Sequence, residues 1–180
     1  SDGRQTPIPL LEQTPTDSPG KTLKARLELA MAYLERGRVD VALEELDRAR
    51  AIDSGHPLLF YVAGLVQLAL GNGAEALRAL QTALSRAPND PDVLFSLGSL
   101  LCQEKQWANG LPLLARAAAN PYYPRRGRAY ANAAWCAWQS GQEDEVAAWL
   151  DSAVTLQPDD FLVRMRLVQW AVRQKRWDEA

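Results

Sequence analysis

A period of 34 residues is the feature of this chain that most restricts its fold. The same small residue returns one period later at several phases of the chain, in the pairs Gly37 and Gly71, Ala42 and Ala76, Ala49 and Ala83, and Gly64 and Gly98. A fixed period over several units is typical of a solenoid, in which each unit buries its apolar face against its neighbours. The sequence therefore predicts a linear stack of like units.

Each unit contains two helical patterns joined by a short turn. Apolar residues recur three and four positions apart, which is the spacing of one face of an amphipathic helix. Glycine ends the first helix of a unit at Gly37, Gly71 and Gly141, and glycine is the residue that most often closes a helix in the left-handed conformation. Strand signals are absent, so the chain is expected to be all-α.

The period divides the chain into a tether and a repeat domain. Residues 1–22 hold four prolines among threonines, serines and glutamines, and this composition predicts a flexible tether. The repeat domain is expected over residues 23–180, with units at 23–56, 57–90, 91–126 and 127–160 and a partial unit at 161–180. In the partial unit, residues 177–180 match the opening of a second helix.

Small residues occupy fixed places in both helices of each unit, where neighbouring backbones must approach closely. In the first helix they are Ala30, Gly64, Gly98 and Ala134. The second helix carries a triplet at constant spacing: Ala42-Leu46-Ala49, Ala76-Leu80-Ala83, Gly110-Leu114-Ala117 and Val146-Leu150-Ala153. This pattern resembles the tetratricopeptide repeat. The resemblance implies a solenoid of helical hairpins wound into a right-handed superhelix.

Composition argues against several classes of function. Twenty basic and 22 acidic residues leave a formal charge of −2, so the basic surface of a nucleic-acid-binding protein is not expected. One histidine and two cysteines are too few for a structural zinc site, and no metal or cofactor is expected. The longest apolar run, residues 57–71, is shorter than a membrane-spanning helix. No catalytic motif occurs, so we expect no enzyme.

Large apolar residues occupy the first-helix positions that face the concave side of such a solenoid. We predict that they form a groove for an apolar or amphipathic segment of a protein partner. The candidate residues of this groove are Tyr61, Leu65, Phe95, Arg128, Trp135 and Trp138. The aromatic members are expected to act as anchors, because aromatic residues are enriched where partners bind. The alternative is that tight superhelical winding buries these side chains against one another.

The period lengthens by two residues between the third and fourth units, within the segment 120–126. Two prolines are expected to make this insert stiff. Tyr122, Tyr123 and Arg125 are its candidate binding residues, because a break in a repeat often marks a functional loop. The alternative is a neutral insertion filled by aromatic packing.

The two cysteines lie on helices that should be packing neighbours. Cys102 ends the first helix of the third unit, and Cys136 lies within the first helix of the fourth. Two outcomes are open. The cysteines form a disulfide, which export from the cytosol would favour, or they are two buried free thiols in a reducing compartment.

The segment 97–141 carries a more specific resemblance. It combines Leu101-Cys102 near the end of a first helix, the Asn120-Pro121 insert with its tyrosines, and Cys136 in the next helix. These features are similar to those of the PilF/PilW family of type IV pilus biogenesis proteins. The resemblance implies an outer-membrane lipoprotein that faces the periplasm, assists localisation or assembly of the pilus secretin, and supports pilus stability. Its implied membrane attachment is a lipid anchor missing from this chain.

Two other classes of function are left open by the sequence. One is a cytosolic chaperone or co-chaperone that uses the same groove for a client helix or a carboxy-terminal peptide. The other is an assembly scaffold, associated with the inner membrane, for a different secretion or polysaccharide-export system. The compartment distinguishes them, because a signal sequence with a lipidation site would favour the pilus function and a cytosolic start would favour a chaperone.

Overall fold

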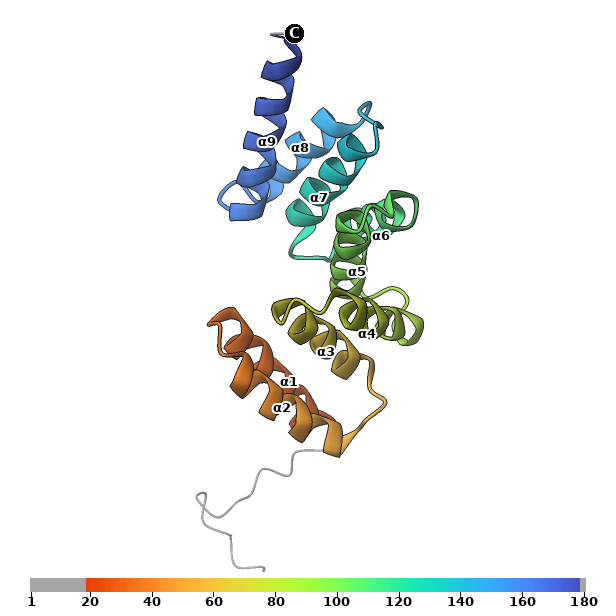
Figure 1. The fold of residues 1–180 in the computed structure, drawn as a ribbon, viewed down its shortest axis with the longest axis vertical. Helices are drawn as coiled ribbons and strands as arrows, with labels where there is room; N and C mark the ends of the chain where they lie inside the picture. The colour runs from red at the N-terminus through yellow and green to blue at the C-terminus, as the bar shows by residue number, and fades with distance from the viewer. Residues whose placement is uncertain (1–18, 179–180) are drawn as a thin grey trace, which may run out of the picture.

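The protein is a stack of helical hairpins in the computed structural model, which describes residues 19–178. Over this range the chain forms nine α-helices and no strand (Figure 1). The helices are α1 (Pro19–Glu35), α2 (Val39–Ile52), α3 (Pro57–Ala69), α4 (Gly73–Arg86), α5 (Pro91–Gln103), α6 (Trp107–Ala119), α7 (Arg126–Gln139), α8 (Val146–Leu156) and α9 (Phe161–Asp178). The predicted all-α class is confirmed for these residues.

Consecutive helices pair into hairpins, and the hairpins follow one another in chain order along an elongated stack (Figure 1). Helix α1 packs on α2, α3 on α4, α5 on α6, and α7 on α8, and each hairpin also contacts the next one. Helix α9 follows as a single helix that packs on α7 and α8. The contacts therefore join near neighbours, as in a solenoid, and the four hairpins correspond to the four predicted complete units.

Each hairpin turns at a residue in the left-handed conformation. Gly37, Gly71 and Gly141 have φ values of 74°, 77° and 80°. In the first hairpin, the amide of the residue after Gly37 donates to the carbonyl of Tyr33 at 2.9 Å. This bond, which reaches back five residues, satisfies a carbonyl at the helix end. The third hairpin makes the same turn with Lys105, whose φ is 63°.

Helices α3 and α5 begin at a capping side chain followed by proline. The Nδ1 atom of His56 accepts the backbone N–H of Leu58 at 3.1 Å, and Pro57 is the first residue of α3. The Asp90 carboxylate caps α5 in the same way, ahead of Pro91. Capping satisfies amides that have no partner within the helix, and proline is tolerated in the first turn. These caps mark the starts of the second and third predicted units.

Small residues allow the helices of a hairpin to approach closely. Ala42, Ala76 and Ala153 are fully buried in the second helices of their hairpins. Gly98 on α5 faces Gly110 on α6, and a Cβ atom added at Gly110 would lie 2.7 Å from the Gly98 carbonyl oxygen. The predicted reason for the small residues, close approach of helix backbones, therefore holds at this contact.

Two boundaries differ from the sequence-based expectation. Helix α1 begins at Pro19, four residues before the predicted start of the repeat domain, because proline is suited to the first helical turn. The rest of the predicted tether lies outside the described residues. The prediction that a new helix opens at Trp177 is wrong, because α9 continues without a turn to Asp178. Lys175 occupies the position that Gly141 holds one unit earlier, so the glycine that ends a helix is missing there.

Candidate functional site

Odd-numbered helices border two pockets, and the surface that these helices form around the pockets is here called the odd-helix face. The N-terminal pocket, of about 570 Å³, is bounded by α1, α3 and α5, and its lining includes Met31, Leu34, Tyr61, Leu65, Asp92 and Arg125. The C-terminal pocket, of about 600 Å³, lies between α7 and α9, and its lining includes Trp135, Trp138, Val168, Gln169, Val172 and Arg176. Four of the six predicted groove residues therefore line a pocket.

The N-terminal pocket has an apolar floor. Tyr61 and Leu65 are four residues apart on α3, so they lie on the same side of that helix. Met31 and Leu34 complete the floor from the end of α1. Tyr61 is only 8% exposed and Leu65 is half-buried. Of the two predicted residues, Leu65 is therefore the one with more surface open to a partner, and Tyr61 is largely a core residue.

Acidic side chains also line this pocket. Glu35, Asp90 and Asp92 line the pocket, and Arg125 from the insert is the basic residue on its wall. Burial and then the negative charge of Asp92 raise the pKa of the Tyr61 hydroxyl. Acidic side chains therefore outnumber basic ones in the described lining of the N-terminal pocket.

The C-terminal pocket is built on two tryptophans that lie three residues apart on α7. Trp138 is 4% exposed and packs against Trp170 of α9, with ring centroids 5.4 Å apart. Trp135 is half-buried, and the Arg166 guanidinium lies over its ring at 4.2 Å from the centroid. Trp138 therefore belongs mainly to the core between α7 and α9, whereas Trp135 is accessible from the pocket.

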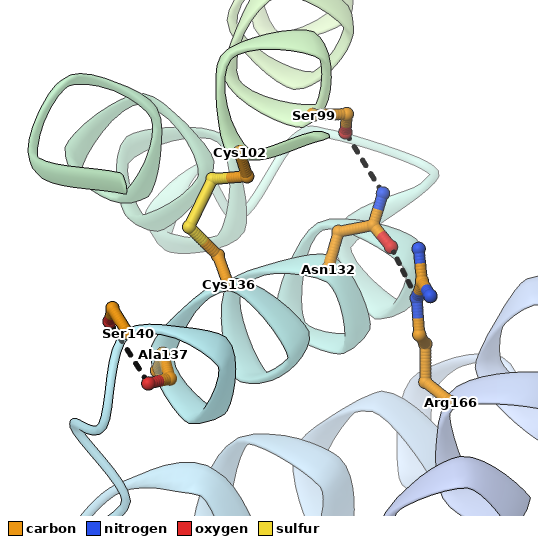
Figure 2. Close-up of a disulfide and its surroundings, with 7 residues drawn as sticks. All are labelled: Ser99, Cys102, Asn132, Cys136, Ala137, Ser140 and Arg166. Atoms are coloured by element: carbon orange, nitrogen blue, oxygen red, sulfur yellow. Dashed lines mark hydrogen bonds between the residues drawn. A yellow bond between two sulfur atoms is a disulfide. The ribbon is translucent and has the colours of Figure 1, made fainter. Parts of the chain in front are cut away.

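A polar chain crosses three odd-numbered helices beside this pocket (Figure 2). Asn132 on α7 is 4% exposed; its Nδ2 donates to Ser99 Oγ at 2.9 Å, and its Oδ1 accepts from Arg166 Nε at 3.0 Å. Arg166 also donates to Gln169 at 2.9 Å, and burial lowers its pKa to about 10. Arg166 is not among the sequence-based candidates. Its separation of one full period from Asn132 is the signal that could have identified it.

Phe95 and Arg128, the other two predicted groove residues, form a pair and line neither pocket. The Arg128 guanidinium lies 5.5 Å from the centroid of the Phe95 ring. Arg128 also forms an ion pair with Asp160, at 3.7 Å from Nε to Oδ2. The contact between Phe95 and Arg128 joins α5 to α7, and the ion pair with Asp160 partly neutralises the charge of Arg128.

The insert places its three candidate residues in three different environments. Tyr123 is 4% exposed and packs with Leu94 and Ala118 in the core, whereas Tyr122 is 91% exposed. Arg125 forms part of the wall of the N-terminal pocket. Core packing therefore accounts for Tyr123, and the predicted binding role of Tyr122 and Arg125 stays a prediction.

Cys102 of α5 and Cys136 of α7 form a disulfide (Figure 2). Their Cα atoms are 5.6 Å apart, within the normal range for this bond. Both residues are almost fully buried. Of the two alternatives predicted for these cysteines, the structure contains the covalent one, and it joins the third hairpin to the fourth.

Two classes of feature are absent from residues 19–178. No group of three or more His, Cys, Asp or Glu side chains in this range could hold a metal ion. None of its helices has both the length and the apolar character that a bilayer-spanning segment requires.

Family comparisons match most of the chain. A tetratricopeptide repeat model matches residues 19–57 and 61–124, and a second model of the same repeat matches residues 127–160. The chain is also similar to an uncharacterised protein of Haemophilus influenzae, with 26% identity over 121 residues, or 67% of this chain and 68% of that protein.

Solved structures of similar shape include two pilus proteins. PilF of Pseudomonas aeruginosa has a TM-score of 0.78 and 19% identity, over 89% of this chain and 72% of that one. PilW, described as a widely conserved type IV pilus biogenesis factor, has a TM-score of 0.72 and 23% identity, over 79% and 66%. YrrB, a repeat protein with an unusual peptide-binding site, has a TM-score of 0.62 and 24% identity, over 79% and 73%. At these identities the likeness establishes a shared fold.

Proposed function

Because the chain belongs to the tetratricopeptide repeat family, we propose that it is a non-enzymatic scaffold that binds a segment of a protein partner on the odd-helix face. The observation that carries this function is accessible apolar surface at a pocket. Val168 and Val172 are 63% and 45% exposed on α9, and half-buried Trp135 lies across the same pocket. Apolar surface of this kind is stabilised when a partner covers it.

The proposed partner is a component of the type IV pilus, and specifically the secretin whose localisation or assembly the protein assists. The fold shared with PilF and PilW supports this proposal, as do the sequence features of the segment 97–141. The Cys102–Cys136 disulfide supports an oxidising compartment, because such bonds persist outside the cytosol. We place the protein at the periplasmic face of the outer membrane, attached by a lipid anchor, where it supports pilus stability.

Capture of the secretin from envelope extracts tests this function. Trp135→Ala should reduce the amount of secretin recovered by at least about five-fold, since truncating an interface anchor commonly costs more than 1 kcal/mol. Quantitative mass spectrometry of the captured material provides the measurement. Trp138 is unsuitable for this test, because it is buried against Trp170 and its truncation would also disturb the core.

Trp149→Ala is the matched control. Trp149 is also half-buried, but it lies on α8 and lines neither the N-terminal nor the C-terminal pocket. This variant should capture the secretin as well as the unmodified protein does. Normal capture by a folded Trp135→Ala variant, or an equal loss in both variants, would contradict the proposed function.

A further inference from the structure

The two pockets of the odd-helix face differ in charge. Within residues 19–178, the charged residues that line the N-terminal pocket are Glu35, Asp90, Asp92 and a single arginine, Arg125. Among the described residues, the lining of the C-terminal pocket contains two arginines and no acidic residue. Both pockets also present apolar side chains, so each offers an apolar contact next to charges of one predominant sign.

The carboxylates of the N-terminal pocket are only partly neutralised by the protein itself. Asp90 accepts the backbone N–H groups of Asp92 and Val93 as the cap of α5. Glu35 and Asp92 form no ion pair with another residue in the range 19–178. The negative charge of Asp92 also raises the pKa of buried Tyr123, although burial is the larger cause. A cation that entered this pocket would therefore meet two carboxylates without ionic partners.

The arginines of the C-terminal pocket differ in their partners. Arg173 is held by Glu143, at 2.7 Å from Nη2 to Oε1. Arg176 is exposed and forms no ion pair within the described part of the chain. Beside the pocket, the partners of partly buried Arg166 among the described residues are all neutral: Asn132, Gln169 and the Trp135 ring. The positive charge here therefore exceeds the negative charge.

We propose, building on the function above, that the odd-helix face binds a partner segment whose charges are opposite to those of the two pockets. An apolar residue next to Lys or Arg occupies the N-terminal pocket, and an apolar residue next to Asp or Glu occupies the C-terminal pocket. Arg128 of α7 lines neither pocket, and its charge is offset by Asp160. Charge complementarity of this kind selects partners and fixes their register on the surface.

Short capped peptides test each pocket separately. The probes are acetyl-Gly-Leu-Arg-Gly-amide and acetyl-Gly-Leu-Glu-Gly-amide, titrated by NMR into the whole chain with its disulfide intact. His56, the only histidine, and Met31 report on the N-terminal pocket, and the indole N–H groups of Trp135 and Trp138 report on the C-terminal pocket. The Arg peptide should bind about five-fold more tightly than the Glu peptide at the first site, and the order should reverse at the second.

Charge-neutralising variants identify the side chains responsible. The double variant Glu35→Gln and Asp92→Asn should remove the Arg preference of the N-terminal pocket, and Arg176→Gln should reduce the Glu preference of the C-terminal pocket. Asp90 and Arg173 are left unchanged because they cap α5 and pair with Glu143. The matched controls, Glu44→Gln and Arg50→Gln on α2, should change neither preference. Raising NaCl from about 50 to about 500 mM should weaken both preferences.

Four results would overturn this inference: equal affinity of both peptides at each pocket, a reversed order, preferences that survive neutralisation, or no shift at the reporter groups up to about 10 mM peptide. These results are distinct from a failure of the proposed function. If Trp135→Ala loses secretin capture and the peptides give any of these four results, the scaffold function is supported and the proposed charge preference of the pockets is wrong. If the pockets discriminate between the peptides but the protein does not capture the secretin, the charge preference is supported and the proposed secretin partner is wrong.

Discussion

Lys105 is the one residue other than glycine that has a positive φ within residues 19–178. It closes the helix of the third hairpin in the way that Gly37, Gly71 and Gly141 close theirs, and its N–H donates to the carbonyl of Cys102 at 3.0 Å. A side chain in the left-handed region costs roughly 1–2 kcal/mol through contact between Cβ and the following carbonyl. The third turn therefore forms because packing of the hairpin requires it, at some cost in local conformation.

Replacing Lys105 by glycine should stabilise the protein. The relief of the left-handed strain exceeds the extra entropy that glycine has in the unfolded chain, so the free energy of unfolding should rise by about 0.5–1 kcal/mol. Urea unfolding followed by circular dichroism measures the change. Lys105→Ala keeps a Cβ atom and is expected to stay within about 0.5 kcal/mol of the unmodified protein. A glycine variant no more stable than the alanine variant would show that the turn carries no strain.

At the scale of whole helices, α5 and α6 approach each other closely at Gly110. A Cβ atom at Gly110 would lie 2.6 Å from Cys102 Sγ and 2.7 Å from the Gly98 carbonyl oxygen. Real Cβ atoms do not approach backbone oxygen so closely, and a backbone cannot move away as a flexible side chain can. The two helices would have to separate to admit one methyl group.

Gly110→Ala should therefore lower the free energy of unfolding by about 1–3 kcal/mol, which is typical of overpacking. The sign is informative, because alanine at an unstrained helical position is normally stabilising by about 0.4–1 kcal/mol. Gly73→Ala is the control, since the nearest atom to its added Cβ, Glu104 Oε1, is at an ordinary 3.5 Å. Thermal and urea unfolding of both variants would contradict the packing interpretation if Gly110→Ala were as stable as Gly73→Ala.

At the scale of the molecule, the disulfide is the one covalent link between hairpins among the described residues. The hairpins otherwise contact near neighbours only, so the stability of the stack is approximately the sum of hairpin and interface contributions. The bond joins residues 34 positions apart and spans all of α6. It therefore restricts the unfolded chain across the boundary between the third and fourth hairpins.

Removing this bond should destabilise the whole stack. The double variant Cys102→Ala and Cys136→Ala should lose about 3–4 kcal/mol, the amount that the chain-entropy model assigns to a loop of this length. Alanine is preferred to serine because it leaves no unpaired hydroxyl in the core. Urea unfolding of the unmodified protein in a phosphine reductant should show a similar loss, and the variant should not respond to the reductant. A reductant-insensitive unmodified protein would refute the prediction.

The sequence by itself determined the helical hairpins and their order. The signals are the small residues Gly98 and Gly110, turn glycines such as Gly37, and prolines at helix starts. Each acts within a few residues or at one repeated contact, so a 34-residue period reveals it. Position within the repeat likewise predicted that Cys102 and Cys136 are neighbours. Where the local signal is missing, as at Lys175, the predicted turn fails and α9 continues.

Only the tertiary structure decided how deeply each residue of the odd-helix face is buried. Trp135 and Trp138 both belong to the predicted groove, yet Trp138 is buried against Trp170 of α9 and Trp135 stays half-buried under the Arg166 guanidinium. The entry of Arg125 into a pocket built by α1, α3 and α5, and the contact of Arg166 with Trp135, likewise depend on how hairpins stack. The physical reason is that repeat position sets the direction of a side chain, whereas the angle between successive hairpins sets the distance to what it meets.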